Sequence, residues 1–196
     1  MRIATWNVNS VRARLPRVID WLRTAKPDVV CLQETKCVNE QFPLEALEAE
    51  GYHCAIYGQK TYNGVAILSR DTPDEVVCGL PDDDEGAEAR VIAAQWGDLR
   101  VLNLYVINGR EVGHEMYDVK LQWLDRVGAY VRSDFPVSDK VIVLGDFNIT
   151  FDDRDIYDPE KWHERILCST PEREALARLM EPGLTDAYRR FHEETG

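Results

Sequence analysis

Two short runs made entirely of apolar residues constrain the fold more than any other feature of the sequence. Val29–Leu32 follows the break at Pro27, and Val141–Leu144 is followed directly by Gly145. Four apolar residues between such boundaries are too few for a helix, so each run predicts a strand, and Val29–Leu32 predicts a buried one. No apolar run is longer than a strand needs, and we therefore expect no membrane-spanning segment.

Helical patterns alternate with strand patterns along the rest of the chain. Helices are predicted over Arg12–Thr24, Pro43–Glu50, Met116–Arg132 and Pro171–Met180. Further strands are predicted over Arg2–Val8, His53–Tyr57, Gly64–Leu68, Arg90–Gln95 and Arg100–Val106. This interleaving predicts a layered α/β domain with a mixed sheet. Because no fixed repeat or flexible linker interrupts the 196 residues, we expect a single domain over 1–196.

Composition narrows the class of protein further. Hydrophobic residues make up 44% and charged residues 30% of the chain, a balance typical of globular proteins and not of disordered ones. The five cysteines are odd in number and form no Cys-x-x-Cys pair, which argues against a disulfide framework and a structural zinc site. With no apolar signal core at the N-terminus, the simplest location is the cytoplasm.

Charge has two opposite consequences for nucleic-acid binding. The formal net charge of −12 predicts weak nonspecific binding to DNA or RNA. Residues 1–36, however, hold seven basic and only three acidic side chains, so a local anion site is compatible with the acidic total. Acid-dense stretches such as 82–85 and 152–160 are interpreted as solvated loops.

Polar side chains with no structural need to be there follow several of the predicted strands. Asn7 closes the first strand, Glu34 comes just after the second, Tyr105 lies in a third, and Asp146 and Asn148 follow the last apolar run. Strand ends of an α/β sheet hold short side chains rigidly at one rim, where ligand groups converge. We therefore expect these side chains to lie close together.

Strand geometry adds detail around the last run. If the strand conformation persists, Asp146 and Asn148 point to one side while Phe147 points to the other. Gly145 allows the backbone to approach a neighbour closely or to turn before Asp146. A plain turn is the alternative, since Gly, Asp and Asn are ordinary turn residues.

The cluster of Asn7, Glu34, Asp146 and Asn148 would offer hard oxygen ligands without histidine or cysteine. Such a set favours Mg²⁺ or Mn²⁺, which take one or two carboxylates and leave the other positions to water and phosphate. This chemistry suits phosphoryl displacement, in which a second carboxylate activates a water. A phenol such as Tyr105 can donate to a phosphate oxygen, although a tyrosine there is also typical of a packed core.

Four segments together resemble a known family. They are Gln33-Glu34-Thr35-Lys36, Trp6–Ala13, Leu104–Gly109 and Gly145–Ile149. They resemble motifs of the exonuclease III family of abasic-site DNA endonucleases, and the similarity extends over essentially the whole chain. Gln-Glu and Gly-Asp-x-Asn are shared with the wider endonuclease/exonuclease/phosphatase superfamily, whereas Lys36 and the Asn7–Arg12 segment favour the nuclease branch.

The resemblance implies a DNase I-like, four-layered α/β sandwich in which two mixed sheets lie face to face with helices outside. It also implies Mg²⁺-dependent hydrolysis of phosphodiesters at abasic sites and 3′ ends of double-stranded DNA, by a protein that we expect to be a monomer.

The resemblance also implies a role for each matched residue. Glu34 would be the principal metal ligand with Asn7 close by, and Asp146 would activate the attacking water or bind metal. Asn148 would orient the site and contribute to the metal environment, and Tyr105 would contact the scissile phosphate. Arg12 and Arg90 would contact DNA phosphates.

One departure from the family pattern is large. The family continues with an aromatic segment that lines the abasic pocket, an Arg-Ile-Asp strand and a late Ser-Asp-His motif, none of which is present in these 196 residues. We therefore expect the C-terminal strands of the second sheet to be missing and activity to be weak or absent. Two other hypotheses stay open: a superfamily phosphoesterase that acts on a small or lipid phosphate, and a catalytically impaired DNA-binding fragment.

Overall fold

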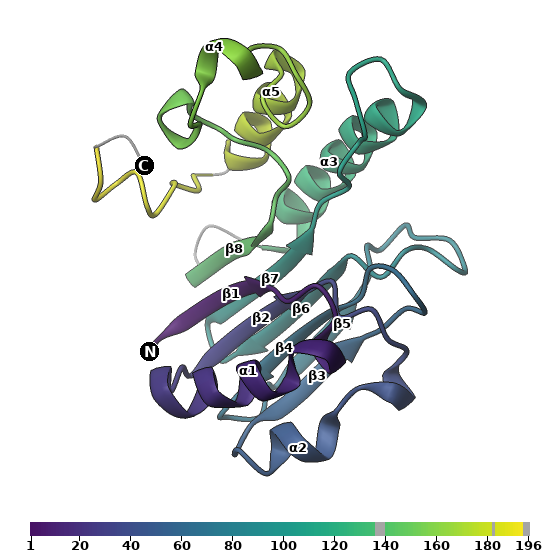
Figure 1. Ribbon diagram of the computed structural model, residues 1–196, viewed down its shortest axis with the longest axis vertical. Helices are drawn as coiled ribbons and strands as arrows, with labels where there is room; N and C mark the ends of the chain where they lie inside the picture. The colour runs from purple at the N-terminus through teal and green to yellow at the C-terminus, as the bar shows by residue number, and fades with distance from the viewer. Residues whose placement is uncertain (136–139, 182, 194–196) are drawn as a thin grey trace. The chain divides into compact units, whose positions relative to one another are not determined.

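The computed structural model describes residues 1–135, 140–181 and 183–193 (Figure 1). The chain divides into two compact units. The first consists of Met1–Tyr105 with Asp139–Asp146, and the second of Val106–Ser138 with Phe147–Gly196. The single domain expected over 1–196 stays a prediction.

The first sheet of the first unit has the strand order β1-β2-β4-β3. Its strands are β1 (Ile3–Asn7), β2 (Val29–Gln33), β4 (Val65–Ser69) and β3 (His53–Tyr57). β1 and β2 are parallel and the other neighbours antiparallel, so the sheet is mixed. β2 is buried along its whole length, which confirms the buried strand predicted from Val29–Leu32.

The second sheet of the same unit has the order β5-β6-β7-β8. Its strands are β5 (Glu75–Cys78), β6 (Val91–Trp96), β7 (Leu99–Tyr105) and β8 (Lys140–Asp146). β7 and β8 are parallel and the other neighbours antiparallel. At the edge of this sheet, the apolar residues of β8 are half-buried.

Apolar side chains cover both faces of the first sheet. Side chains of β2 and β4 pack on one face against Ile92, Ala94 and Val101 of the second sheet. On the other face, β2 and β4 pack against Val18 and Leu22 of α1 (Val11–Ala25), and α2 (Leu44–Glu48) lies on the same side (Figure 1). Two mixed sheets face to face with helices outside are what we predicted from the sequence, and this part of the fold class is confirmed.

The second unit is helical in its described part. α3 (Glu115–Asp134) and α5 (Thr170–Met180) pack against each other, and α4 (Pro159–Trp162) is a single short turn. The described residues also form two 3₁₀ turns, η1 (Asn39–Gln41) in the first unit and η2 (Asp153–Asp155) in the second. Among the described helices, none has the length and apolar character needed to cross a membrane.

A buried pair of amide side chains joins the two sheets at the end of β2. Gln33 Nε2 donates to Asn103 Oδ1 over 2.7 Å, and both side chains are almost fully buried. Asn103 Nδ2 donates in turn to the carbonyl oxygens of Leu32 and Ala66, at 3.0 and 3.1 Å. Buried amides are stable only when they are paired, so this network fixes how the sheets meet next to Glu34.

Gly145 lies where no other residue fits, as the sequence predicts. Its φ is 142°, and a Cβ at this position would lie 1.9 Å from the carbonyl oxygen of Leu104 on the neighbouring β7. The close backbone approach predicted at this glycine is therefore confirmed.

We expect Gly145→Ala to lower the free energy of unfolding by about 3 kcal/mol or more, since a methyl group must displace the β7 backbone. Gly97 is the matched control, because its φ of 56° also favours glycine but a Cβ there would have no neighbouring atom within 4 Å. Gly97→Ala should cost only about 1 kcal/mol. Urea denaturation of both variants checks this, and equal losses would contradict the steric explanation.

Candidate functional site

Three polar side chains from separate strands meet in the first unit. Asn7 ends β1, Glu34 directly follows β2, and Asp146 ends β8. Asn7 Nδ2 donates to Glu34 Oε1 over 2.9 Å and to Asp146 Oδ2 over 2.7 Å. The two carboxylates therefore face the same amide nitrogen, as expected for side chains that converge at one rim of the strands.

Both oxygens of Glu34 are hydrogen-bonded. The Tyr105 hydroxyl donates to Oε1 over 2.8 Å, and Lys36 Nζ lies 2.7 Å from Oε2. Lys36 Nζ also donates to Asn9 Oδ1 over 2.6 Å. We did not predict Lys36 as a site residue, although its place in the Gln-Glu-x-Lys motif was the available signal.

These contacts set the protonation states of Glu34 and Tyr105. Burial acts to raise the pKa of Glu34, but hydrogen bonds from Asn7, Lys36 and Tyr105 outweigh it, so the pKa is lowered. Burial raises the pKa of Tyr105, and the hydrogen bond to Glu34 and its negative charge raise it further. Glu34 is thus held as a carboxylate and Tyr105 as a protonated donor.

The backbone leaves the extended conformation where the strands end, which corrects one sequence argument. β8 ends at Asp146, and Asn148 has a φ of 48°, so the strand alternation expected to carry Asp146 and Asn148 to one side does not persist. Glu34 also has a positive φ, 54°, immediately after β2. A left-handed non-glycine residue costs about 1 kcal/mol or more, and such strain is typical of functional sites.

Asn148 belongs to the second unit and is held there by neighbouring polar groups. Its Nδ2 donates to the carbonyl oxygen of Val106 over 2.9 Å, and its Oδ1 accepts from Asn108 Nδ2 over 3.3 Å. Its predicted roles in orienting the site and in the metal environment stay predictions.

The two arginines expected to contact DNA differ in their surroundings. Arg12 is exposed near the start of α1. Arg90 is buried, with its guanidinium 4.8 Å from the centre of the Tyr105 ring. Its Nε donates to Glu88 over 2.6 Å and its Nη1 to the Tyr105 carbonyl oxygen over 3.2 Å. Arg90 therefore supports Tyr105, and both phosphate contacts stay predictions.

The donor set fits a hard divalent cation. Glu34 and Asp146 supply carboxylate oxygens beside one another, and Mg²⁺ binds one or two carboxylates with water and phosphate in its other positions. No group of three histidine, cysteine or acidic side chains within the described residues forms a larger metal site. Asn7 turns its nitrogen toward the carboxylates while its Oδ1 accepts from the Asn9 amide at 3.1 Å, so its role as a ligand stays a prediction.

Comparison with known proteins gives a match along almost the whole chain. The sequence pattern of the endonuclease/exonuclease/phosphatase family matches residues 4–192. Exodeoxyribonuclease III of Haemophilus influenzae is 33% identical over 203 aligned residues, which cover 98% of this chain and 76% of that protein.

Solved structures are similar to this chain in fold as well as in sequence. The 3′-5′ exonuclease NExo from Neisseria meningitidis is 45% identical, with a TM-score of 0.96 over all of this chain and 77% of its own. A second structure of the Neisseria protein, named there as a 3′ phosphatase, contains a product DNA hairpin. An AP endonuclease from Archaeoglobus fulgidus is 37% identical, with a TM-score of 0.93 over 98% of this chain and 74% of its own.

Proposed function

Because the chain belongs to the endonuclease/exonuclease/phosphatase family, we propose that it is a DNA repair nuclease of the exonuclease III type that depends on Mg²⁺ or Mn²⁺. The observation that carries this proposal is the shared contact of the Glu34 and Asp146 carboxylates with the Asn7 amide. Family membership also confirms the resemblance predicted from Gln33-Glu34-Thr35-Lys36.

The substrate that we propose is double-stranded DNA with abasic sites or blocked and recessed 3′ ends. The Haemophilus relative is named an exodeoxyribonuclease and the Archaeoglobus neighbour an AP endonuclease, which supports both kinds of target. The Neisseria neighbour, at 45% identity, is named for 3′ chemistry and favours 3′ ends as the main target. A monomeric state and a cytoplasmic location are part of the proposal.

Each residue of the site would have a distinct task. Glu34, ionised by its three hydrogen bonds, would hold the metal, and Asp146 would accept the proton of the attacking water. Tyr105, kept protonated, would donate to a phosphate oxygen, while Asn7 keeps the two carboxylates together. The bound cation would neutralise charge that develops on the phosphate.

The test compares four substrates in Mg²⁺, in Mn²⁺ and in EDTA. Three are end-labelled duplexes with an abasic site, a recessed 3′ end or a 3′-phosphate, and the fourth is a set of inositol phosphates. We expect weak but metal-dependent hydrolysis of the duplexes alone, since the late Ser-Asp-His motif of the family is absent from these 196 residues. Hydrolysis of inositol phosphates instead would favour a superfamily phosphoesterase, and DNA binding without cleavage in any metal would leave a DNA-binding fragment.

A further inference from the structure

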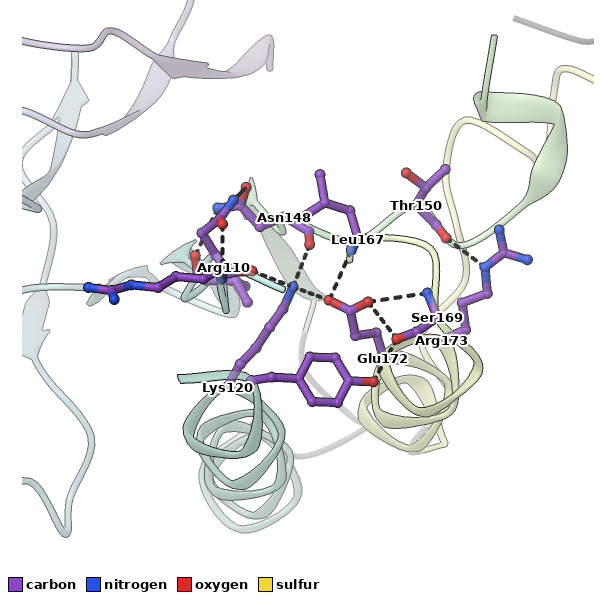
Figure 2. Close-up of polar contacts among 11 residues, drawn as sticks. Arg110, Lys120, Asn148, Thr150, Leu167, Ser169, Glu172 and Arg173 are labelled. Atoms are coloured by element: carbon purple, nitrogen blue, oxygen red, sulfur yellow. Dashed lines mark hydrogen bonds and ion pairs between the residues drawn. The ribbon is translucent and has the colours of Figure 1, made fainter. Parts of the chain in front are cut away.

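A buried ammonium group in the second unit contacts two main-chain segments at once. Lys120 of α3 is fully buried, and its Nζ donates to the carbonyl oxygen of Asn148 over 2.6 Å and to that of Asn108 over 3.3 Å. Figure 2 shows the ammonium between the Asn148 carbonyl and the carboxylate of Glu172, whose Oε1 lies 2.5 Å away. One charge therefore ties together two loops and a second helix.

Glu172 is fixed just as firmly as Lys120. Its Oε2 accepts from the amide and the hydroxyl of Ser169, at 3.2 and 2.6 Å, and the Tyr117 hydroxyl lies 2.7 Å from that Ser169 hydroxyl. Its Oε1 also accepts from the Leu167 amide over 3.2 Å (Figure 2). A buried ion pair is tolerable only when its remaining hydrogen-bonding capacity is used, and here it is used on both sides.

The two segments held by Lys120 are the ones that leave the strands of the candidate site. Asn108 comes three residues after Tyr105, and Asn148 comes two residues after Asp146. Gly109 lets the first segment lie against the lysine stem, since a Cβ there would be 3.1 Å from Lys120 Cδ. The ion pair of Lys120 and Glu172, called the clamp below, therefore holds the main chain directly beyond two candidate catalytic residues, Tyr105 and Asp146.

Stability alone does not explain such a clamp. Replacing a buried ion pair with neutral or apolar side chains of similar size is often harmless or even stabilising. Asn148, by contrast, has a left-handed φ of 48°, a conformation that asparagine tolerates better than most residues but that its neighbours must still hold in one place. The carbonyl contact with Lys120 and the side-chain contact with Val106 supply that support from two directions.

We propose that Lys120, neutralised by Glu172, is a positioning residue that fixes the main chain of Asn148 for catalysis. This inference rests on the proposed nuclease function. Because a misplacement of about 1 Å can cost about 100-fold in rate, loss of the clamp should lower kcat strongly while leaving DNA binding intact.

The variant that tests the proposal is the double substitution Lys120→Met/Glu172→Gln, which removes both charges together and leaves no unpaired ion in the interior. We expect it to fold, with kcat on the preferred duplex lowered about 30-fold or more and KM changed by less than about threefold. Hydrogen exchange of the amides in 106–109 and 147–150 should be faster than in the wild type.

A second, milder double variant tests the proposal if the methionine variant does not fold. Lys120→Gln/Glu172→Gln keeps an N–H that can donate to the Asn148 carbonyl, so its kcat should lie between those of the wild type and the methionine variant. The matched control is Asp125→Asn/Arg178→Gln, an exposed pair 3.0 Å apart that also joins α3 and α5 but contacts neither loop. The control should keep wild-type kcat and loop exchange.

The possible outcomes distinguish a failure of the proposed nuclease function from a failure of the positioning role of Lys120. An inactive wild-type chain would count against the nuclease function itself. An active wild type whose folded neutral variants keep full kcat and unchanged loop exchange would overturn the positioning role alone. A loss of kcat that the Asp125→Asn/Arg178→Gln control shares would also overturn it, since the effect would then belong to the α3–α5 packing.

Discussion

The Asp146→Asn variant should fold normally and lose about 10³-fold in kcat on an abasic or 3′-blocked duplex, within the range expected when a general base is removed. The asparagine oxygen can still accept the hydrogen bond from Asn7, so the geometry of the site is kept. What is lost is the negative charge that accepts the proton of the attacking water. Single-turnover kinetics at saturating enzyme measure this step without interference from product release.

Stability should not fall together with activity in this variant. Asp146 and Glu34 share the donor Asn7 Nδ2, and two carboxylates this close repel each other, so removing one charge relieves the folded state. We expect a Tm no lower than that of the wild type. Asp98→Asn is the control, because Asp98 is an exposed partner of Lys140 at the start of β8, and its kcat should not change. Normal turnover in Asp146→Asn would remove this residue from the mechanism.

The strands that could be predicted from the sequence are those with a strong local signal. β2 and β3 are predicted within one residue at each end, because β2 is almost wholly apolar and both lie between clear breaks. β5 is missed, since Glu75–Cys78 offers only two consecutive valines and lies exposed at a sheet edge. α4 is also missed, because this single turn begins inside the acidic stretch 152–160 interpreted as a loop.

The convergence of the site could be predicted, but its hydrogen-bond roles could not. Strand ends place Asn7, Glu34 and Asp146 together whatever the details of their side chains. Which atom of an amide faces a carboxylate depends on its other neighbours, and here the Asn9 amide takes the oxygen of Asn7. The nitrogen of Asn7 is thereby left to join the two carboxylates.

The same limit applies to residues that act through the backbone. Lys120 is visible in the sequence only as part of the helical pattern over Met116–Arg132, because its partners Asn148 and Glu172 lie 28 and 52 positions away. Asn148 is predicted from strand alternation, yet its left-handed φ ends that alternation. Local periodicity describes regular elements, whereas these contacts depend on tertiary packing.

We expect Glu34→Gln to weaken binding of the divalent cation strongly. The variant keeps an oxygen for the Asn7 and Tyr105 hydrogen bonds but loses the charge that would hold the cation. Substitutions beside a metal site cost about 10- to 100-fold in affinity even outside the first ligand shell, so we expect the Mn²⁺ dissociation constant to rise at least about tenfold. Mn²⁺ titration followed by electron paramagnetic resonance measures this without reference to catalysis.

The control and the pH dependence separate the metal role of Glu34 from a structural one. Glu50→Gln breaks an exposed pair with Arg23 in the same unit and should leave Mn²⁺ affinity unchanged. Because the fold lowers the pKa of Glu34, its ionised form stabilises the protein at neutral pH. This contribution to the free energy of unfolding is lost as the pH falls below the ordinary carboxyl pKa and through the lowered pKa of Glu34. The metal-free Glu34→Gln variant should therefore lose less stability on acidification than the wild type. Unaltered Mn²⁺ binding with a flattened acid response would mean that Glu34 stabilises the fold and does not hold the metal.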